Sequence, residues 1–255
     1  MEKKEHELKS LLTRQDFAVC GQNDCVLDTA KAYAYGFAHT TEGIAVISDF
    51  KDNECYIYSG KFGSELAGLP DFSSGYNSAF EDVVFSCADK DEMLERHILE
   101  LRFFNYLRDI PVKHRTEYQL SCLIRFYKGR DRNPISILHT TRYLKCDHKG
   151  NVWLGICTYI PYPRCIGKWK GDIINIATGE LVGADLYENS DRKLLTKRQL
   201  EILRLLAKGV PSKQIADRLN ISLHTVNRHR QDILSCLKVA NTAAAVEIGL
   251  RIGLL

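Results

Sequence analysis

Donor-rich side chains recur at helical spacing in the segment LHTVNRHRQDILSCL, which covers residues 223–237. Positions i, i+3, i+4 and i+7 share one face of a helix, and here they hold His224, Asn227, Arg228 and Gln231. Arg pairs with the O6 and N7 atoms of guanine, and Asn or Gln pairs with adenine, in the major groove of DNA. We therefore interpret Asn227, Arg228 and Gln231 as candidates for contacts with base edges.

The opposite face of this segment is apolar, because Val226, Ile233 and Leu237 recur at i, i+7 and i+11. That spacing predicts a face packed on a core. Basic and hydroxyl side chains at the rim suit hydrogen bonds to phosphate, which position a protein on DNA without reading its sequence. The candidates for phosphate contacts are Lys213, Thr225, His229 and Arg230. A polar helix face alone equally fits a solvated surface, so the interpretation depends on the neighbouring helices.

Four short helices are predicted between residues 195 and 255. Thr196, followed three residues later by Gln199, forms a capping box that starts a helix at Lys197. Gly209 ends that helix by allowing a left-handed backbone. The other helices are predicted over 212–219, over 223–237 after the cap Ser222, and from the cap Asn241 to near Gly253.

Residues 195–255 resemble the LuxR-type (GerE-type) helix-turn-helix, the output domain of many bacterial regulators. The matching motifs are LT-x-R at 195–198, E-I-L-R-L-L-A-x-G at 201–209, K-x-I-A-x-x-L at 213–219, I-S-x-x-T-V-x-x-H-R at 221–230, and the later N-x-A-A-A-V and G-L-L. The resemblance implies base contacts from Asn227, Arg228 and Gln231, and phosphate contacts from Lys213, Thr225 and His229. It also implies dimerisation through the fourth helix, where Thr242, Val246 and Leu250 are the candidates.

Several positions depart from the family pattern. Pro211 stands where a capping Ser usually opens the second helix, with Ser212 as a substitute one residue on. Gln214 replaces the usual Glu. Asn227 replaces a basic residue, and this second replacement shifts the expected base contact toward adenine. Lys238 replaces a Gly after the third helix, which would cost roughly 1–2 kcal/mol if that turn requires positive φ. These departures leave the target DNA sequence open.

Charge is unevenly distributed along the 255 residues. Residues 190–255 hold 12 Lys/Arg and 5 Asp/Glu, a net charge of +7, whereas residues 1–189 hold 23 and 27, a net charge of −4. A basic module joined to a mildly acidic one suggests that only the C-terminal part meets a polyanion. We expect a cytoplasmic protein, because no apolar run approaches the ~20 residues of a membrane helix and the start, MEKKEHELKS, lacks the apolar segment of a secretory signal.

The N-terminal part is predicted to consist of helices and antiparallel strands. Helices are predicted over 2–14, 28–39, 62–68 and 89–108, strands over 44–50, 54–59, 116–128, 135–146 and 151–160, and a further hairpin around 177–180. This order resembles a PAS domain over residues 40–161, most specifically in the hairpin leading into F-G-S-E-L-A-G and in the hairpin RYLKCDHKGNVWLGICTYI. The resemblance implies a five-stranded antiparallel sheet flanked by helices, which binds a small molecule, flavin or haem, or only dimerises.

The resulting fold class is α+β. A PAS-like sensor or dimerisation domain with N-terminal helices is predicted over residues 1–183, a linker over 184–194, and an all-α domain of four helices over 195–255. A phosphoacceptor receiver domain is disfavoured, because the long antiparallel strands after residue 115 contradict a doubly wound parallel sheet.

We predict no cofactor and no metal site. The nine cysteines lack a C-x-x-C pair, and reduced thiols acting as small core residues explain them best. Zinc at Cys146 and His148, or a redox pair of Cys20 and Cys25, are the alternatives. A haem iron would need an axial ligand such as a histidine, for which the candidates are His39, His97, His114 and His139, but a lone histidine is more often a packed or surface residue.

The sequence favours a transcription regulator over an enzyme. It has no G-x-S-x-G, P-loop, G-x-G-x-x-G or H-E-x-x-H motif, so no catalytic residue is assigned. We expect the partners to be double-stranded DNA, a second copy of the chain and an unidentified small ligand, with RNA polymerase a further candidate. The alternative is an interaction scaffold, in which the PAS-like domain binds a protein without any small ligand and recruits it to DNA.

Overall fold

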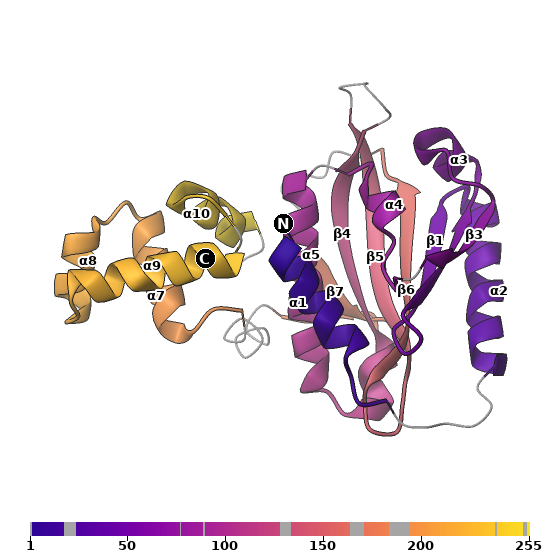
Figure 1. Cartoon of the computed structure of the whole chain (residues 1–255), viewed down its shortest axis with the longest axis horizontal. Helices are drawn as coiled ribbons and strands as arrows, with labels where there is room; N and C mark the ends of the chain where they lie inside the picture. The colour runs from indigo at the N-terminus through magenta and orange to yellow at the C-terminus, as the bar shows by residue number, and fades with distance from the viewer. Residues whose placement is uncertain are drawn as a thin grey trace.

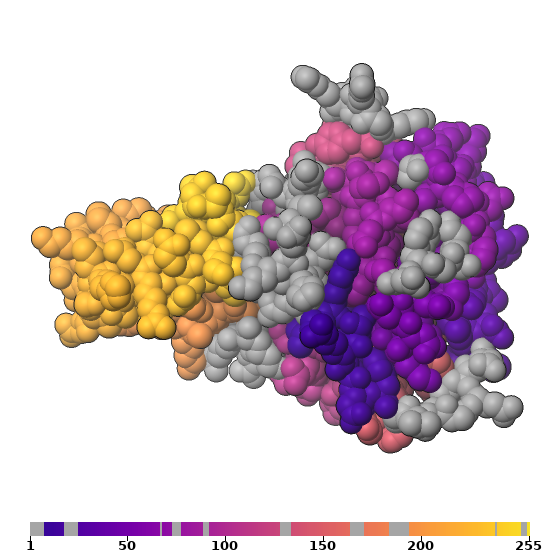
Figure 2. Space-filling view, in the orientation of Figure 1, coloured from indigo at the N-terminus to yellow at the C-terminus, as the bar shows by residue number. Residues whose placement is uncertain are grey.

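The computed structural model describes residues 2–17, 24–76, 78–88, 90–127, 134–163, 171–183, 194–237, 239–251 and 254–255. They form a sheet-bearing part and a helical part. The helical part projects from one side of the sheet-bearing part (Figures 1 and 2). The sheet-bearing part contains α1 (Glu2–Thr13), α2 (Asp24–Thr41), β1 (Ile44–Asp49), β2 (Glu54–Ser59), α3 (Lys61–Ala67), β3 (Phe72–Tyr76), α4 (Asp82–Phe85), α5 (Lys90–Arg108), the 3₁₀ helix η1 (Val112–Glu117), β4 (Tyr118–Phe126), β5 (Ile135–Cys146), β6 (Val152–Pro161), β7 (Asp172–Asn175) and β8 (Glu180–Leu181). The helical part contains α7 (Lys197–Ala207), α8 (Ser212–Leu219), α9 (Leu223–Leu237) and α10 (Thr242–Arg251).

The described strands form one antiparallel sheet in the order β3-β2-β1-β6-β5-β4-β7-β8. The register places Val46 of β1 opposite Ile57 of β2 on one side and Cys157 of β6 on the other. The five predicted strands occupy adjacent positions in this order, and the predicted hairpin is β7–β8. The eight-stranded sheet is therefore larger than the five-stranded sheet that we expected. Strand β3 was not predicted, because FSSGY lacks the alternation of apolar side chains that marks a strand.

Helices cover both faces of the sheet, which explains why every residue of β1 is buried. Successive strand residues point to opposite faces. Ile44 and Val46 belong to the cluster that contains α1 and α5, whereas Ala45 and Ile47 pack with the alanines of α2. Figure 1 shows α1 and α5 on the face toward the helical part, and α2 on the opposite face.

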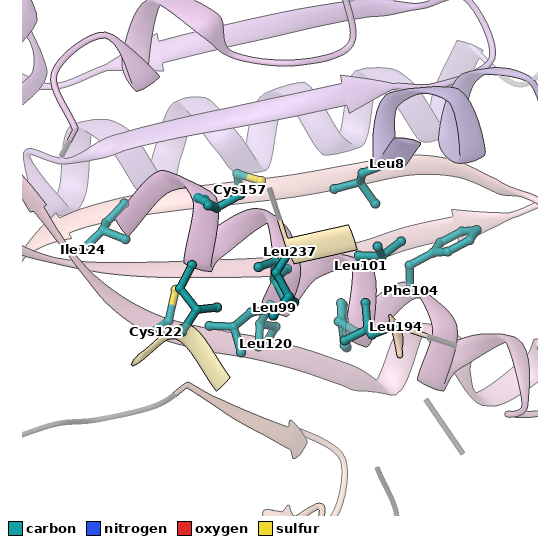
Figure 3. Close-up of a cluster of buried hydrophobic side chains, with 14 of the residues drawn as sticks. Leu8, Leu99, Leu101, Phe104, Leu120, Cys122, Ile124, Cys157, Leu194 and Leu237 are labelled. Atoms are coloured by element: carbon teal, nitrogen blue, oxygen red, sulfur yellow. The ribbon is translucent and has the colours of Figure 1, made fainter. Parts of the chain in front are cut away.

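Helix α5 is the central element of the larger hydrophobic cluster (Figure 3). Its predicted apolar positions are confirmed as buried, namely Met93, Ile98, Leu101, Phe104 and Leu107. The helix also buries polar side chains, which the apolar pattern did not predict; these are Arg96, His97, Glu100, Arg102 and Asn105. The same cluster includes Leu194 and Leu237 of the helical part.

The four C-terminal helices begin at the predicted residues, and α7, α9 and α10 begin at their predicted caps. Thr196 and Gln199 form both hydrogen bonds of the capping box of α7, and Gly209 has a φ of 74°. The Asn241 side chain accepts a hydrogen bond from the Ala244 N–H, which caps α10. The predictions about Lys238 and Gly253 lie outside the described residues, as does most of the predicted linker. Its last residue, Leu194, is buried.

Among the described residues no single helix is long and apolar enough to cross a membrane. Helices α9 and α10, taken together as one bent pair, do satisfy the same criterion of length and composition.

Candidate nucleic-acid interface and a buried charged cluster

Helices α8 and α9 are joined by a tight turn. Asn220 ends α8 in the left-handed conformation, with φ 51° and ψ 45°, which Asn tolerates better than most residues. The Ser222 hydroxyl accepts a hydrogen bond from the Thr225 N–H at 3.0 Å and thereby caps the start of α9. The turn and the cap together set the direction in which α9 leaves α8.

Helix α9 has one buried and one exposed face, as its sequence predicted. Val226, Ile233 and Leu237 are almost completely buried. The opposite face presents four exposed side chains, namely His224, Asn227, Arg228 and Gln231. No hydrogen bond or ion pair within the described residues is recorded for the side chains of Asn227, Arg228 or Gln231. They therefore form a continuous row of donors open to a ligand.

The candidate phosphate-binding residues differ in their environments. Lys213 is exposed in the first turn of α8. The Thr225 hydroxyl lies 2.8 Å from the Ser222 hydroxyl. His229 is half-buried, and within the described residues its buried Nδ1 atom has no hydrogen-bond partner. Ser212 does not replace the missing cap, because Pro211 occupies the cap position of α8 and no side chain caps that helix.

Arg230 is engaged inside the helical part. Its Nη1 donates to the Ser212 hydroxyl at 2.8 Å, and its Nη2 donates to the Thr242 hydroxyl at 2.9 Å. One guanidinium thus connects α9 to the first residues of α8 and α10. The phosphate contact expected for Arg230 stays a prediction, and in the structure two nitrogens of its guanidinium already donate to partners within the helical part.

Helix α10 carries the residues expected to mediate dimerisation. Thr242 and Val246 are half-buried, and the Thr242 hydroxyl already accepts from Arg230. Leu250 is 49% exposed, so it offers apolar surface to a second molecule.

A charged cluster that sequence analysis missed lies between α5 and the sheet. Arg96 Nη2 lies 3.3 Å from Glu81 Oε1 and 2.7 Å from Glu100 Oε1. Arg96 Nε donates to His139 Nε2 at 3.0 Å, and the Tyr159 hydroxyl donates to Glu81. Only 1% of the Arg96 side chain is exposed. The residues come from different elements, so no motif could reveal them; the only local sign is the spacing of Arg96 and Glu100, four apart on one helix.

Burial and ion pairing shift the pKa values of Arg96 and Glu100 in opposite directions. Burial on its own would raise the pKa of Glu100, but the attraction of the Arg96 guanidinium holds that pKa at about 2. Burial likewise opposes the charged form of Arg96, yet the neighbouring Glu100 keeps the pKa of Arg96 raised well above its ordinary value. Burial, followed by the charge of Arg96, lowers the pKa of His139. The pair of Arg96 and Glu100 is therefore charged, and His139 is neutral at pH 7.

The same place contains one group of potential metal ligands among the described residues. Atoms of Glu100, His139 and Cys157 lie within 4.8 Å of one another, and all three residues are buried. Arg96 donates to each of them, with Nη2 lying 3.8 Å from Cys157 Sγ. A guanidinium in contact with all three atoms opposes a metal cation there, because it would repel the ion and occupies the lone pairs.

The other histidine and cysteine candidates are dispersed. The His39 ring lies at a tilt beside the Tyr35 ring, His97 packs against the Phe85 ring, and His114 Nδ1 lies 2.8 Å from Glu117 Oε1. Neither Cys146 nor His148 belongs to the ligand group found in the described part of the chain. Cys20 lies outside the described residues.

Residues 193–248 match the family described as "Bacterial regulatory proteins, luxR family" (GerE). Residues 193–248 form a LuxR-type helix-turn-helix domain. The match covers α7, α8 and α9 and the start of α10, including every residue assigned above to base or phosphate contacts.

Curated relatives match the chain over a similar, limited stretch. The oxygen regulatory protein NreC of Staphylococcus haemolyticus is 41% identical over 84 residues, which are 33% of this chain and 39% of that protein. NreC of Staphylococcus epidermidis is 43% identical over 85 residues, with the same coverage. The chain thus spans about two fifths of the length of these relatives.

Solved structures overlap over more of the chain but with low similarity. A phage VqmA–DPO complex is 16% identical with a TM-score of 0.28, covering 91% of this chain and 92% of that one. The Vibrio cholerae VqmA dimer without target DNA is 16% identical with a TM-score of 0.29, covering 89% and 88%. Escherichia coli SdiA is 15% identical with a TM-score of 0.27, covering 99% and 97%.

Proposed function

We propose that this protein is a sequence-specific DNA-binding transcription regulator. The observation that carries the proposal is the exposed face of α9, where Asn227, Arg228 and Gln231 stand free on the helix that follows the turn of a LuxR-type domain. In a helix-turn-helix the second helix enters the major groove. Arg228 would contact guanine, and Asn227 and Gln231 would contact adenine. Lys213, Thr225 and His229 would bind phosphate and fix the register of the helix on DNA.

DNA binding would require two copies of the chain. One module of this size contacts about 5 base pairs at most, and dimers of helix-turn-helix proteins bind two half-sites. Thr242, Val246 and Leu250 of α10 are the residues proposed to form the contact between copies. Leu250 is the most exposed of the three and would be the centre of that contact.

The sheet-bearing part would act as a PAS-like sensor that controls how the two DNA-binding modules are held. The order of its elements supports this: β1 and β2, the short helix α3, β3, the short helix α4, the long helix α5, and then β4, β5 and β6. The signal would be a small ligand or a protein partner. A scaffold that binds only a protein, and recruits it to DNA without any small ligand, is the second candidate.

The experiment that tests the proposal is selection of bound fragments from sheared source DNA. The wild type is compared with the double variant Asn227→Ala/Arg228→Ala, whose exposed side chains can be removed without disturbing the core. We expect the wild type alone to enrich a repeated motif. Equal enrichment by both proteins, or only salt-sensitive background with the wild type, would contradict sequence-specific binding through α9.

A further inference from the structure

A pocket of about 290 Å³ lies at the surface of the sheet-bearing part, where the last turn of α5 meets the turn between β5 and β6. Its floor is apolar and is formed by Phe104, Leu107 and Val152, which are almost completely buried. Its walls carry three cations, namely Arg108, Arg115 and Lys149. No acidic residue within the described part of the chain lines it. The pocket shares no residue with the buried cluster around Arg96.

Backbone carbonyls hold Arg115 in place. Its Nε donates to the Ile110 carbonyl at 2.9 Å, its Nη2 donates to the Arg108 carbonyl at 3.0 Å, and its Nη1 donates to the Gly150 carbonyl. A guanidinium has five N–H donors, so these bonds leave two of them unused. Gly150 permits this close approach, because a Cβ atom there would lie 2.9 Å from Arg115 Nη1. All three acceptors are uncharged, and no ion pair is recorded for Arg115 among the described residues.

The other two cations of the pocket, Arg108 and Lys149, are exposed. Within the described ranges no hydrogen bond or ion pair is recorded for the Arg108 side chain. Lys149 Nζ lies 2.7 Å from Asp16 Oδ2, but the Asp16 side chain is 91% exposed, and such a pair is weak. The Asp147 carboxylate accepts hydrogen bonds from the backbone of its own turn and does not line the pocket. Two of the three positive charges therefore have no carboxylate partner.

Charge and volume together define the class of ligand that fits this pocket. A phosphate monoester carries a charge of about −1.5 to −2 at pH 7, which balances the two unopposed cations. Its oxygens also match the fork of N–H donors on a guanidinium. Pockets for small molecules begin at about 300 Å³, so this one holds a small molecule rather than a polymer. The apolar floor offers contact area to an organic group attached to the phosphate.

We propose that this pocket binds a small phosphate monoester. Its phosphate contacts Arg108 and Arg115, and its organic group packs against Phe104 and Leu107. Because Arg108 and Lys149 are exposed, the ligand enters from solvent without a rearrangement of the fold. The proposal concerns ligand binding alone, so it stands or falls independently of DNA binding by the helical part.

The test titrates three probes into the full chain by isothermal calorimetry at about pH 7.5, where the phosphate is doubly charged. Phenyl phosphate carries the charge and a ring, inorganic phosphate carries only the charge, and phenol carries only the ring. We expect phenyl phosphate to bind with a Kd of about 0.1–1 mM. Inorganic phosphate should bind roughly tenfold more weakly, because it leaves the apolar floor uncovered. Phenol should show no binding, because it leaves the cations unpaired.

Two variants that lose the same charge locate the binding. Arg108→Gln removes an exposed cation of the pocket and should weaken the binding of phenyl phosphate roughly tenfold. Lys113→Gln is the matched control, because Lys113 is exposed in η1, close along the chain and outside the pocket lining. Its Kd should stay within about twofold of the wild-type value. Phenyl phosphate should also raise the unfolding temperature of the wild type and of Lys113→Gln more than that of Arg108→Gln.

Four outcomes would overturn the proposal. No binding of phenyl phosphate would mean that the three cations form only a solvated surface. Equal binding of inorganic phosphate and phenyl phosphate would mean that the apolar floor selects nothing. Equal losses in Arg108→Gln and Lys113→Gln would reduce the effect to attraction by the overall charge. Displacement of phenyl phosphate by a scrambled DNA duplex would assign the pocket to the DNA backbone instead of a small molecule.

Discussion

The two parts of the molecule use charged side chains in opposite ways. The sheet-bearing part buries Arg96 and Glu100 in its core, where they stabilise one another. The helical part belongs to a segment with a net charge of +7 and exposes Lys213 and Arg228 to solvent. A buried charge is committed to its partners, whereas an exposed charge remains free to bind a polyanion. Substitutions should therefore change folding in the first part and DNA binding in the second.

The largest effect is expected for Arg96→Met, because it leaves the buried carboxylates of Glu81 and Glu100 without their cation. The free energy of unfolding should fall by about 3–5 kcal/mol in urea titrations. The control Lys61→Met removes an exposed cation 3.9 Å from Glu65 and should change stability by less than about 0.5 kcal/mol. Adding Glu81→Gln and Glu100→Gln to Arg96→Met should recover part of the loss. If the triple variant is less stable still, packing rather than charge explains the effect.

Glu100→Gln should give a difference in stability that depends on pH. The pKa of Glu100 in the folded protein is about 2, below its ordinary value of 4.5, so its contribution is complete above about pH 4.5 and disappears as the pH falls toward 2. This drop corresponds to about 3 kcal/mol. The variant should be less stable than the wild type at pH 7 and should converge with it near pH 2. The exposed control Glu65→Gln should match the wild type at every pH, and a constant difference for Glu100→Gln would refute the assignment.

Arg228→Ala and Lys213→Ala should separate base contacts from phosphate contacts. Arg228→Ala should weaken binding to the selected DNA site by about 1–3 kcal/mol and relax its specificity. Lys213→Ala should weaken binding to all DNA alike. It should also reduce the slope of log affinity against log salt concentration by about one. Fluorescence anisotropy with selected and scrambled duplexes measures both. Equal, sequence-independent losses from the two variants would overturn the roles given to them.

The smallest effect is expected for Arg230→Ala. Unlike Lys213 and Arg228, Arg230 donates hydrogen bonds to side chains within the helical part. Loss of its hydrogen bonds to Ser212 and Thr242 should lower the free energy of unfolding by about 1–2 kcal/mol. Arg228→Ala, two residues earlier on the same helix, should leave that free energy within about 0.5 kcal/mol of the wild type. Thermal unfolding of the two variants without DNA compares them directly. An unchanged stability for Arg230→Ala would return Arg230 to the candidates for phosphate contact.

Local sequence was sufficient for the helical part. Thr196, Ser222 and Asn241 cap helices at the expected residues, and the spacing of Val226, Ile233 and Leu237 correctly separated the core face of α9 from its exposed face. Caps and periodicity act within a few residues of the chain, so they can be recognised without knowing what packs where. The five main strands were found for the same reason.

Long-range packing settled what the sequence left open. The sequence alone indicated a surface cation at Arg230. In the structure, its guanidinium donates hydrogen bonds to the hydroxyls of Ser212 and Thr242. Arg96 meets Glu81 and His139 only because α5 lies across the sheet, and these two residues are separated from Arg96 by 15 and 43 positions along the chain. A pattern of residue types specifies which positions favour burial, but the partners of a buried charge exist only once distant elements have packed together.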